Sequence, residues 1–153
     1  NVFFLIKSLD ETSVRGSNFY IIILAYLTDI AQSLDFISKK SYKHVNNQHK
    51  KLKFKQFKDL KVIDDRLNLL YKEIIDIFSS RKFERVSIIL AQKEEIIILL
   101  NEKINAQIER TRLEESSPKN TTLYFNILLE TKDLINSIMN LMDEYFRSYK
   151  KSS

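Results

Sequence analysis

The chain contains two histidines, His44 and His49, which lie five residues apart with Asn47 between them. Imidazole is a common zinc ligand, but this spacing across a helix end is too loose to predict a metal site. Such histidines more readily make hydrogen bonds that shape a turn, or stabilise a helix C-terminus, where positive charge is favoured. We therefore predict a structural or interaction loop at these three residues and no metal-binding residues. A metal-dependent phosphate sensor using both histidines is the weaker alternative.

Residue types that support other common chemistry are scarce. The chain has no cysteine and a single glycine, so it can form neither a disulfide nor a phosphate-binding glycine loop. No Glu-x-x-His motif of a di-iron bundle is present. Asp64 and Glu130 stand beside predicted core positions, and either one, if buried, needs a partner such as Lys93. We predict no catalytic residue, no cofactor and no enzyme activity.

The whole chain has a net charge of +5, and lysine dominates one stretch of it. Residues 39–61 hold nine lysines and one acid, Asp59. Four of these lysines form the predicted basic surface: Lys50, Lys51, Lys53 and Lys55. Such a surface could meet anionic lipid headgroups, phosphate groups or an acidic protein, or it could be a solvated helix end. Nucleic acid is not the expected partner, because the stretch lacks arginine and no binding module is visible.

Helical periodicity predicts the elements that hold these residues. Apolar side chains recur at steps of three and four in four segments, beginning near Phe19, Phe54, Phe83 and Thr121. The predicted core stripes are Tyr20, Ile23, Leu27, Ile30, Leu34 and Ile37; Leu60, Ile63, Leu67, Leu70, Ile74 and Ile77; Phe83, Val86, Leu90, Ile97, Leu100, Ile104 and Ile108; and Tyr124, Ile127, Thr131, Leu134, Ile138, Leu141 and Tyr145. Stripes of this kind are stable only when they pack against partners.

We predict breaks at Gly16-Ser17-Asn18, around residues 46–49, at residues 79–82 and at residues 114–120, where Pro118 prevents a continuous helix. The expected N-caps are Ser17 or Asn18 for the first long helix, and Thr121 or Thr122 for the last. The predicted fold is a single all-α domain over residues 1–153, an up-down antiparallel bundle of about four long helices. A splayed three-helix core plus one helix is the variant.

The chain begins with Asn1 and the apolar run Val2 to Ile6, which favours a piece of a longer polypeptide in which residues 1–16 end an upstream helix. The longest uninterrupted apolar runs, over residues 19–27 and 96–100, are shorter than the ~20 residues of a membrane span. We therefore expect this fragment itself to be soluble. A structural helical adaptor that forms a homodimer through Phe3, Phe4 and Ile6 is the alternative to a regulatory role.

Two parts of the chain resemble a known family. The first is the run Ser17-x-Phe19-Tyr20, Tyr26-Leu27-x-Asp29, Ser33-Leu34-x-Phe36-Ile37 and His44-Val45-x-Asn47-x-His49. The second is Glu130-Thr131-Lys132-Asp133-Leu134, followed by Asn140-Leu141. Together they resemble the C-terminal PhoU-like region of bacterial sodium/phosphate cotransporter proteins.

This resemblance implies an all-helical cytoplasmic domain, at the inner (plasma) membrane, that follows a membrane domain carrying out phosphate and sodium ion transport. We therefore expect a noncatalytic regulatory domain whose partners are the attached transmembrane transport domain and either an anionic membrane surface or a signalling protein. PhoU proteins hold metal clusters through Glu/Asp-x-x-x-Asp motifs. No acid in this chain is followed by another acid four residues later, so we do not carry that metal site over.

Overall fold

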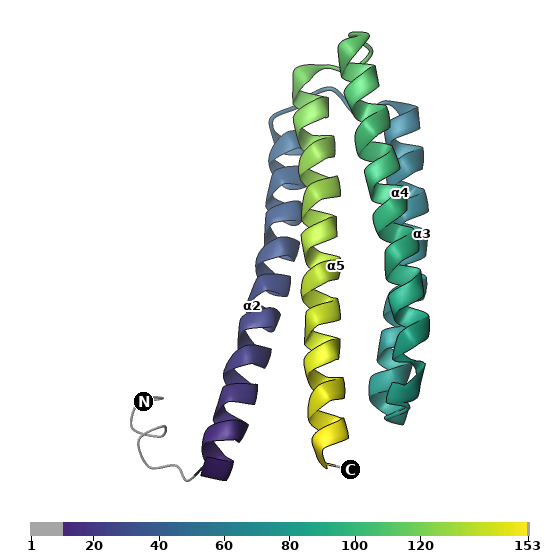
Figure 1. Ribbon diagram of the computed structural model, residues 1–153. Helices are drawn as coiled ribbons and strands as arrows, with labels where there is room; N and C mark the ends of the chain where they lie inside the picture. The colour runs from purple at the N-terminus through teal and green to yellow at the C-terminus, as the bar shows by residue number, and fades with distance from the viewer. Residues whose placement is uncertain (1–10, 153) are drawn as a thin grey trace.

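The computed structural model describes residues 11–152 of the chain, and within them the side chains of residues 16–149. The elements are α2 (Glu11–Asn46), α3 (Phe54–Ser80), a short 3₁₀ helix η1 (Phe83–Arg85), α4 (Val86–Arg112) and α5 (Pro118–Ser152). The long helices run alternately up and down, with α2 beside α5 and α3 beside α4 (Figure 1). The described residues form no strand. The predicted all-α antiparallel bundle is confirmed.

The hydrophobic core lies between α3, α4 and α5. Its fully buried members are Leu70, Ile77, Ile89, Leu100, Tyr124, Leu128, Ile135 and Met142. No residue of α2 belongs to this core cluster, because α2 packs against α5 and makes at most marginal contact with α3 and α4. Three helices therefore supply this core cluster, and α2 is laid along α5.

The predicted stripe of α2 is half correct. Ile23 is buried and Ile30 and Ile37 are partly buried, but Tyr20, Leu27 and Leu34 are exposed. The reason is that α2 has a wide apolar face and only one neighbouring helix. That neighbour covers the side of α2 that carries Ile23, and the adjacent side faces outward.

The stripe of α4 is displaced from the prediction near both ends of the helix. Leu90 and Ile108 are about half exposed, whereas their neighbours Ile89 and Gln107 are fully buried. Because α4 packs against α3 on one side and α5 on the other, its buried seam is set by both neighbours. Burial of a glutamine at this seam is compensated by hydrogen bonds, described below.

Two helix starts differ from the predictions. The first long helix runs from Glu11 through Gly16 without a break, since one glycine costs a helix only about 1 kcal/mol. Of the predicted upstream helix end over residues 1–16, residues 1–10 lie outside the described part of the chain. The last helix begins at Pro118, a favoured first position, and the Ser117 hydroxyl, rather than either threonine, accepts the Asn120 N–H at 3.3 Å.

Each of the three connections uses a left-handed residue that is not glycine. Gln48, Arg81 and Glu114 have φ angles of 54°, 56° and 54°. This conformation costs a residue with a Cβ roughly 1–2 kcal/mol. The chain therefore makes short reversals with its single glycine placed elsewhere, and it does so with some stored strain.

Candidate functional site

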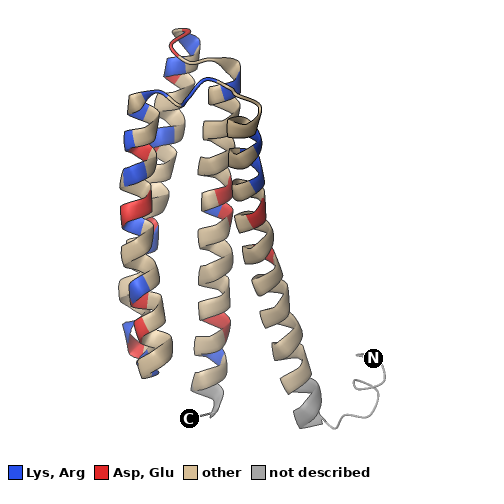
Figure 2. Ribbon diagram, turned by 180° about the vertical axis from the view of Figure 1, so that it is seen from behind, with Lys and Arg blue, Asp and Glu red and all other residues tan. Residues whose placement is uncertain are grey.

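Most of the residues singled out in the sequence gather at one end of the bundle. We call this the loop end; it consists of the α2–α3 connection (residues 47–53), the α4–α5 connection (residues 113–117) and the helix turns beside them. Figure 2 shows lysines and arginines concentrated along the α2–α3 connection and the adjoining end of α2. The Asn120 side chain donates a hydrogen bond to the Lys51 carbonyl at 2.9 Å, which ties the start of α5 to the α2–α3 connection.

The two histidines shape the α2–α3 connection. His44 is buried, and its Nε2 lies 3.0 Å from the Lys50 carbonyl. The His49 N–H donates to the His44 carbonyl at 3.2 Å, and the two rings meet edge to face with centroids 5.1 Å apart. Asn47 is exposed beside them. The structure thus brings the predicted loop residues together and gives the histidines turn-forming contacts.

The predicted basic surface is exposed and lies next to acidic residues. Lys50, Lys51, Lys53 and Lys55 are all exposed, and the first three line an open hollow of about 860 Å³. Glu114 and Glu115 of the opposite connection line the same hollow. Because both signs of charge meet there, this hollow has little net preference for an anion or a cation.

Two further hollows lie at the loop end. An open apolar groove of about 840 Å³ runs between the last turns of α2, the start of α3 and α5, with Val45, Phe54 and Phe57 among its lining residues. A smaller hollow of about 220 Å³ lies between the last turns of α2 and the first turns of α5, and three lysines line it: Lys40, Lys43 and Lys119.

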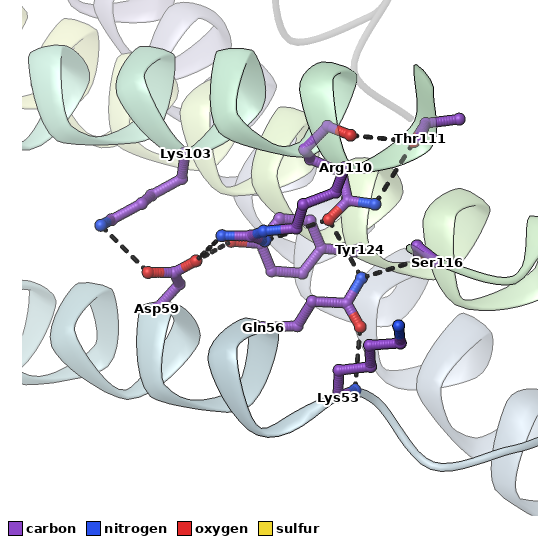
Figure 3. A network of polar contacts seen from close by, with 9 residues as sticks. Lys53, Gln56, Asp59, Lys103, Arg110, Thr111, Ser116 and Tyr124 are labelled. Carbon is purple, nitrogen blue, oxygen red and sulfur yellow. Dashed lines mark hydrogen bonds and ion pairs between the residues drawn. The ribbon is translucent and has the colours of Figure 1, made fainter. Parts of the chain in front are cut away.

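A partly buried ionic cluster joins α3, α4 and α5 just below the loop end (Figure 3). Asp59 of α3 lies 2.7 Å from Arg110 and 3.0 Å from Lys103, both on α4. The Tyr124 hydroxyl of α5 donates to the same carboxylate at 3.1 Å. One carboxylate therefore connects three helices, and its side chain is only 14% exposed.

The cluster fixes the protonation of its members. Burial alone raises the pKa of Asp59, but the hydrogen bonds and charges of Arg110 and Lys103 outweigh it and leave the pKa below its usual value. Burial, together with the negative charge of Asp59, raises the pKa of Tyr124 far above that of a free tyrosine. At neutral pH the cluster is thus a carboxylate held by two cations and a neutral phenol.

A neutral network adjoins the ionic cluster. The Gln56 side-chain amide donates to Gln107 at 3.0 Å and accepts from the Lys53 N–H at 2.9 Å. Gln107 also accepts from Arg110 at 3.1 Å and donates to Thr121 at 3.3 Å. These bonds satisfy both buried glutamines and join the starts of α3 and α5 to the end of α4 (Figure 3).

Of the two acidic residues chosen from the sequence, Glu130 is partly buried and Asp64 is exposed. The side chain of Asp64 is 59% exposed and pairs with Lys61 within its own helix. Glu130 is half-buried, and Lys93 pairs with its neighbour Glu94 rather than with either predicted partner. Sequence reasoning missed Asp59, although it falls in phase with Ile63, Leu67 and Leu70 on the buried face of α3. Among the described residues, no group of three or more His, Asp or Glu could hold a metal ion.

The outer face of α2 is an apolar feature outside the core. We use this name for Tyr20, Ile21, Leu24, Leu27 and Leu34, all of which are exposed. Residues 16–28 of this helix include no charged residue (Figure 2). By length and composition, Gly16–Asn46 is the one described helix that could cross a membrane, with a mean hydropathy of 1.5 over an 18-residue window of which 11% is buried. The count of uninterrupted apolar residues underestimated this segment because isolated polar residues divide it.

Comparison with known proteins gives no matching family model, and no curated protein or solved structure is significantly similar to the chain. The fold and the site define an all-helical bundle with a polar loop end and an apolar outer helix. The resemblance to PhoU-like domains of sodium/phosphate cotransporters stays a prediction.

Proposed function

We propose that this chain is a noncatalytic regulatory or interaction domain that works beside a membrane, as the cytoplasmic part of a sodium-dependent phosphate transporter. The outer face of α2 is the observation that carries this proposal. Large apolar patches that are exposed on a folded domain commonly mark protein or membrane contacts. Each of its half-exposed side chains would contribute roughly 1 kcal/mol if a partner covered it.

The charge distribution supports a position near lipid. Lys39, Lys40 and Lys43 follow the apolar part of α2 within its last turns, and further lysines continue into the α2–α3 connection. A lysine near an anionic leaflet is attracted by about 1 kcal/mol. An apolar face followed by such lysines matches a membrane surface, with the attached transport domain as the neighbouring protein.

The arrangement of polar groups supports a noncatalytic role. The groups with shifted pKa values at the loop end, Asp59, Arg110 and Tyr124, satisfy one another. None of them lines one of the hollows described above. Their geometry serves to hold three helices in register, and a helix bundle held this way can transmit a change at one end to an attached domain.

The test is sodium-dependent phosphate uptake by cells that express the full-length gene product. The variant Leu24→Gln/Leu27→Gln/Leu34→Gln removes apolar surface from the outer face of α2, and Leu69→Gln/Ile75→Gln/Ile98→Gln removes similarly exposed residues from α3 and α4. We expect the first variant to alter the uptake rate at unchanged protein abundance and the second to leave it at the wild-type rate. Equal rates in all three proteins, or uptake that survives deletion of the gene, would contradict the proposal.

A structural adaptor that dimerises is the second candidate, and the same apolar face favours it. The Phe3, Phe4 and Ile6 surface predicted for dimerisation lies outside the described residues, so the structural argument rests on α2 alone. Light scattering of the purified chain and of its outer-face variant separates the candidates. A dimer that becomes a monomer in the variant supports the adaptor, whereas a monomer in both counts against it.

A further inference from the structure

The smaller hollow at the loop end has an unusual composition. Its lining includes Lys40, Lys43 and His49 from the end of α2 and the following turn, and Lys119 and Asn126 from the start of α5. No aspartate or glutamate lines it. By contrast, two glutamates balance the lysines of the larger hollow on the other side of the loop end. The two hollows therefore differ in charge, and of these two only the smaller one is lined by cations without any acid.

The lysines of this hollow form no ion pair with a described residue. No carboxylate in the described part of the chain pairs with Lys40, Lys43 or Lys119, although the Lys40 ammonium lies over the Phe36 ring at 4.9 Å. The lysines are also not required to cap the C-terminus of α2. The carbonyls of Lys43, His44 and Val45 each accept a hydrogen bond from a backbone N–H of residues 47–49. Three ammonium groups are thus available at one place.

The walls of the hollow are held in position. His44 bonds the Lys50 carbonyl on the α2 side, and Asn120 bonds the neighbouring Lys51 carbonyl from the α5 side. The connection between these two bonds keeps the end of α2 and the start of α5 at a set separation. Lysines on such a frame lose less freedom on binding a ligand than lysines on an unattached loop.

The hollow is open to solvent, and its small volume suits a small anionic group. At about 220 Å³ the hollow is below the ~300–1,000 Å³ of pockets for drug-sized molecules. This space is large enough for one tetrahedral oxyanion with part of its hydration shell.

The geometry points to a binding site for a phosphate group between the end of α2 and the start of α5, with Lys43 and Lys119 as the principal cations and Lys40 and His49 beside them. Lysine binds phosphate as a point charge and needs no fixed bidentate geometry. The site lies away from the outer face of α2 and goes beyond the proposed function, so it can exist whether or not that face contacts a membrane. The phosphate can belong to free inorganic phosphate or to a lipid headgroup.

The site is tested by isothermal titration calorimetry, in which inorganic phosphate is added to the 153-residue chain at constant ionic strength. We expect a Kd on the order of 1 mM for the wild-type chain. The variant Lys43→Gln/Lys119→Gln should bind about tenfold more weakly, and the charge-matched control Lys51→Gln/Lys53→Gln should change the Kd by less than about twofold. Circular dichroism establishes that both variants keep the helical content of the wild type.

Vesicles distinguish the two sources of phosphate. A lipid headgroup is the ligand if inorganic phosphate gives no heat but the chain sediments with phosphatidic acid vesicles and not with phosphatidylcholine vesicles. In that case Lys43→Gln/Lys119→Gln should lose sedimentation, and the control variant Lys51→Gln/Lys53→Gln should keep it. Binding to neither probe overturns the inference, as does equal weakening in the control variant. Both of those results would leave the uptake experiment on the outer face of α2 unaffected.

Discussion

Replacement of Asp59 by asparagine is the sharpest test of the ionic cluster. The change removes the negative charge that Arg110 and Lys103 share and keeps the size of the side chain. Loss of one partner from a fully buried ion pair costs about 3–5 kcal/mol, whereas exposed pairs contribute about 0–1 kcal/mol. The side chains of Asp59 and Arg110 are 14% and 15% exposed, so we expect a loss of about 2.5 kcal/mol in the free energy of unfolding. For a chain of this length, that corresponds to a Tm lower by roughly 5–10 °C.

The loss should depend on pH in a defined direction. The pKa of Asp59 in the folded protein lies below the ~3.9 of an unfolded aspartate, since the two cations outweigh the effect of burial. Its contribution to stability is therefore fully present above about pH 4 and disappears as the pH falls through the lower folded-state pKa. The difference between the wild type and Asp59→Asn should narrow over that acidic range.

Urea unfolding followed by far-UV circular dichroism measures both effects. Asp64→Asn is the matched control, because it removes the same charge from the same helix at an exposed ion pair with Lys61, and we expect it to cost under about 0.5 kcal/mol. Equal unfolding free energies for the two variants at neutral pH would refute the reasoning. So would a wild-type advantage over Asp59→Asn that grows, rather than shrinks, in acid.

Three further predictions concern single positions. Tyr124→Phe removes the hydroxyl that donates to Asp59, and should cost about 1.5 kcal/mol in urea unfolding, while Tyr71→Phe, whose hydroxyl bonds no described side chain, should cost under about 0.5 kcal/mol. Arg81→Gly relieves the left-handed conformation after α3 and should raise the unfolding free energy by about 0.5–1 kcal/mol; a decrease would contradict the strain argument. Leu128→Ala, in the centre of the core, should cost about 2–5 kcal/mol, and Leu34→Ala, on the outer face of α2, under about 1 kcal/mol; similar losses at both would show that α2 is covered in solution.

Hydrophobic periodicity predicted the buried positions best on a helix that packs one face against the core. On α3, Ile63, Leu70 and Ile77 lie where the three-four rhythm puts them, since this helix packs one face against the other core helices. The buried positions were predicted less well on a helix with a single neighbouring helix. On α2, which has one neighbour, Leu27 and Leu34 continue the rhythm but are left exposed.

The site was predicted less completely than the fold. The grouping of His44, Asn47 and His49 follows from their closeness in sequence, and in the structure the two histidine rings are in contact beside the turn that contains Asn47. Asp59 could not be paired from the sequence, because Arg110 is 51 residues away and periodicity does not specify which helix faces which. An acid in phase with an apolar stripe is nevertheless a usable signal, since such a position requires a partner when it is buried.

The pairing of α2 with α5 has a consequence for the order in which the fold forms. During synthesis α2 is complete roughly 100 residues before its partner, which at ~5–20 residues per second is a delay of about 5–20 s. Helices α3 and α4 can pair in that interval through their short connection, but α2 has no helix to pack against. Among the described helices, α2 is therefore made first and waits longest for its partner, which gives a chaperone or a lipid bilayer time to bind α2 before α5 is made.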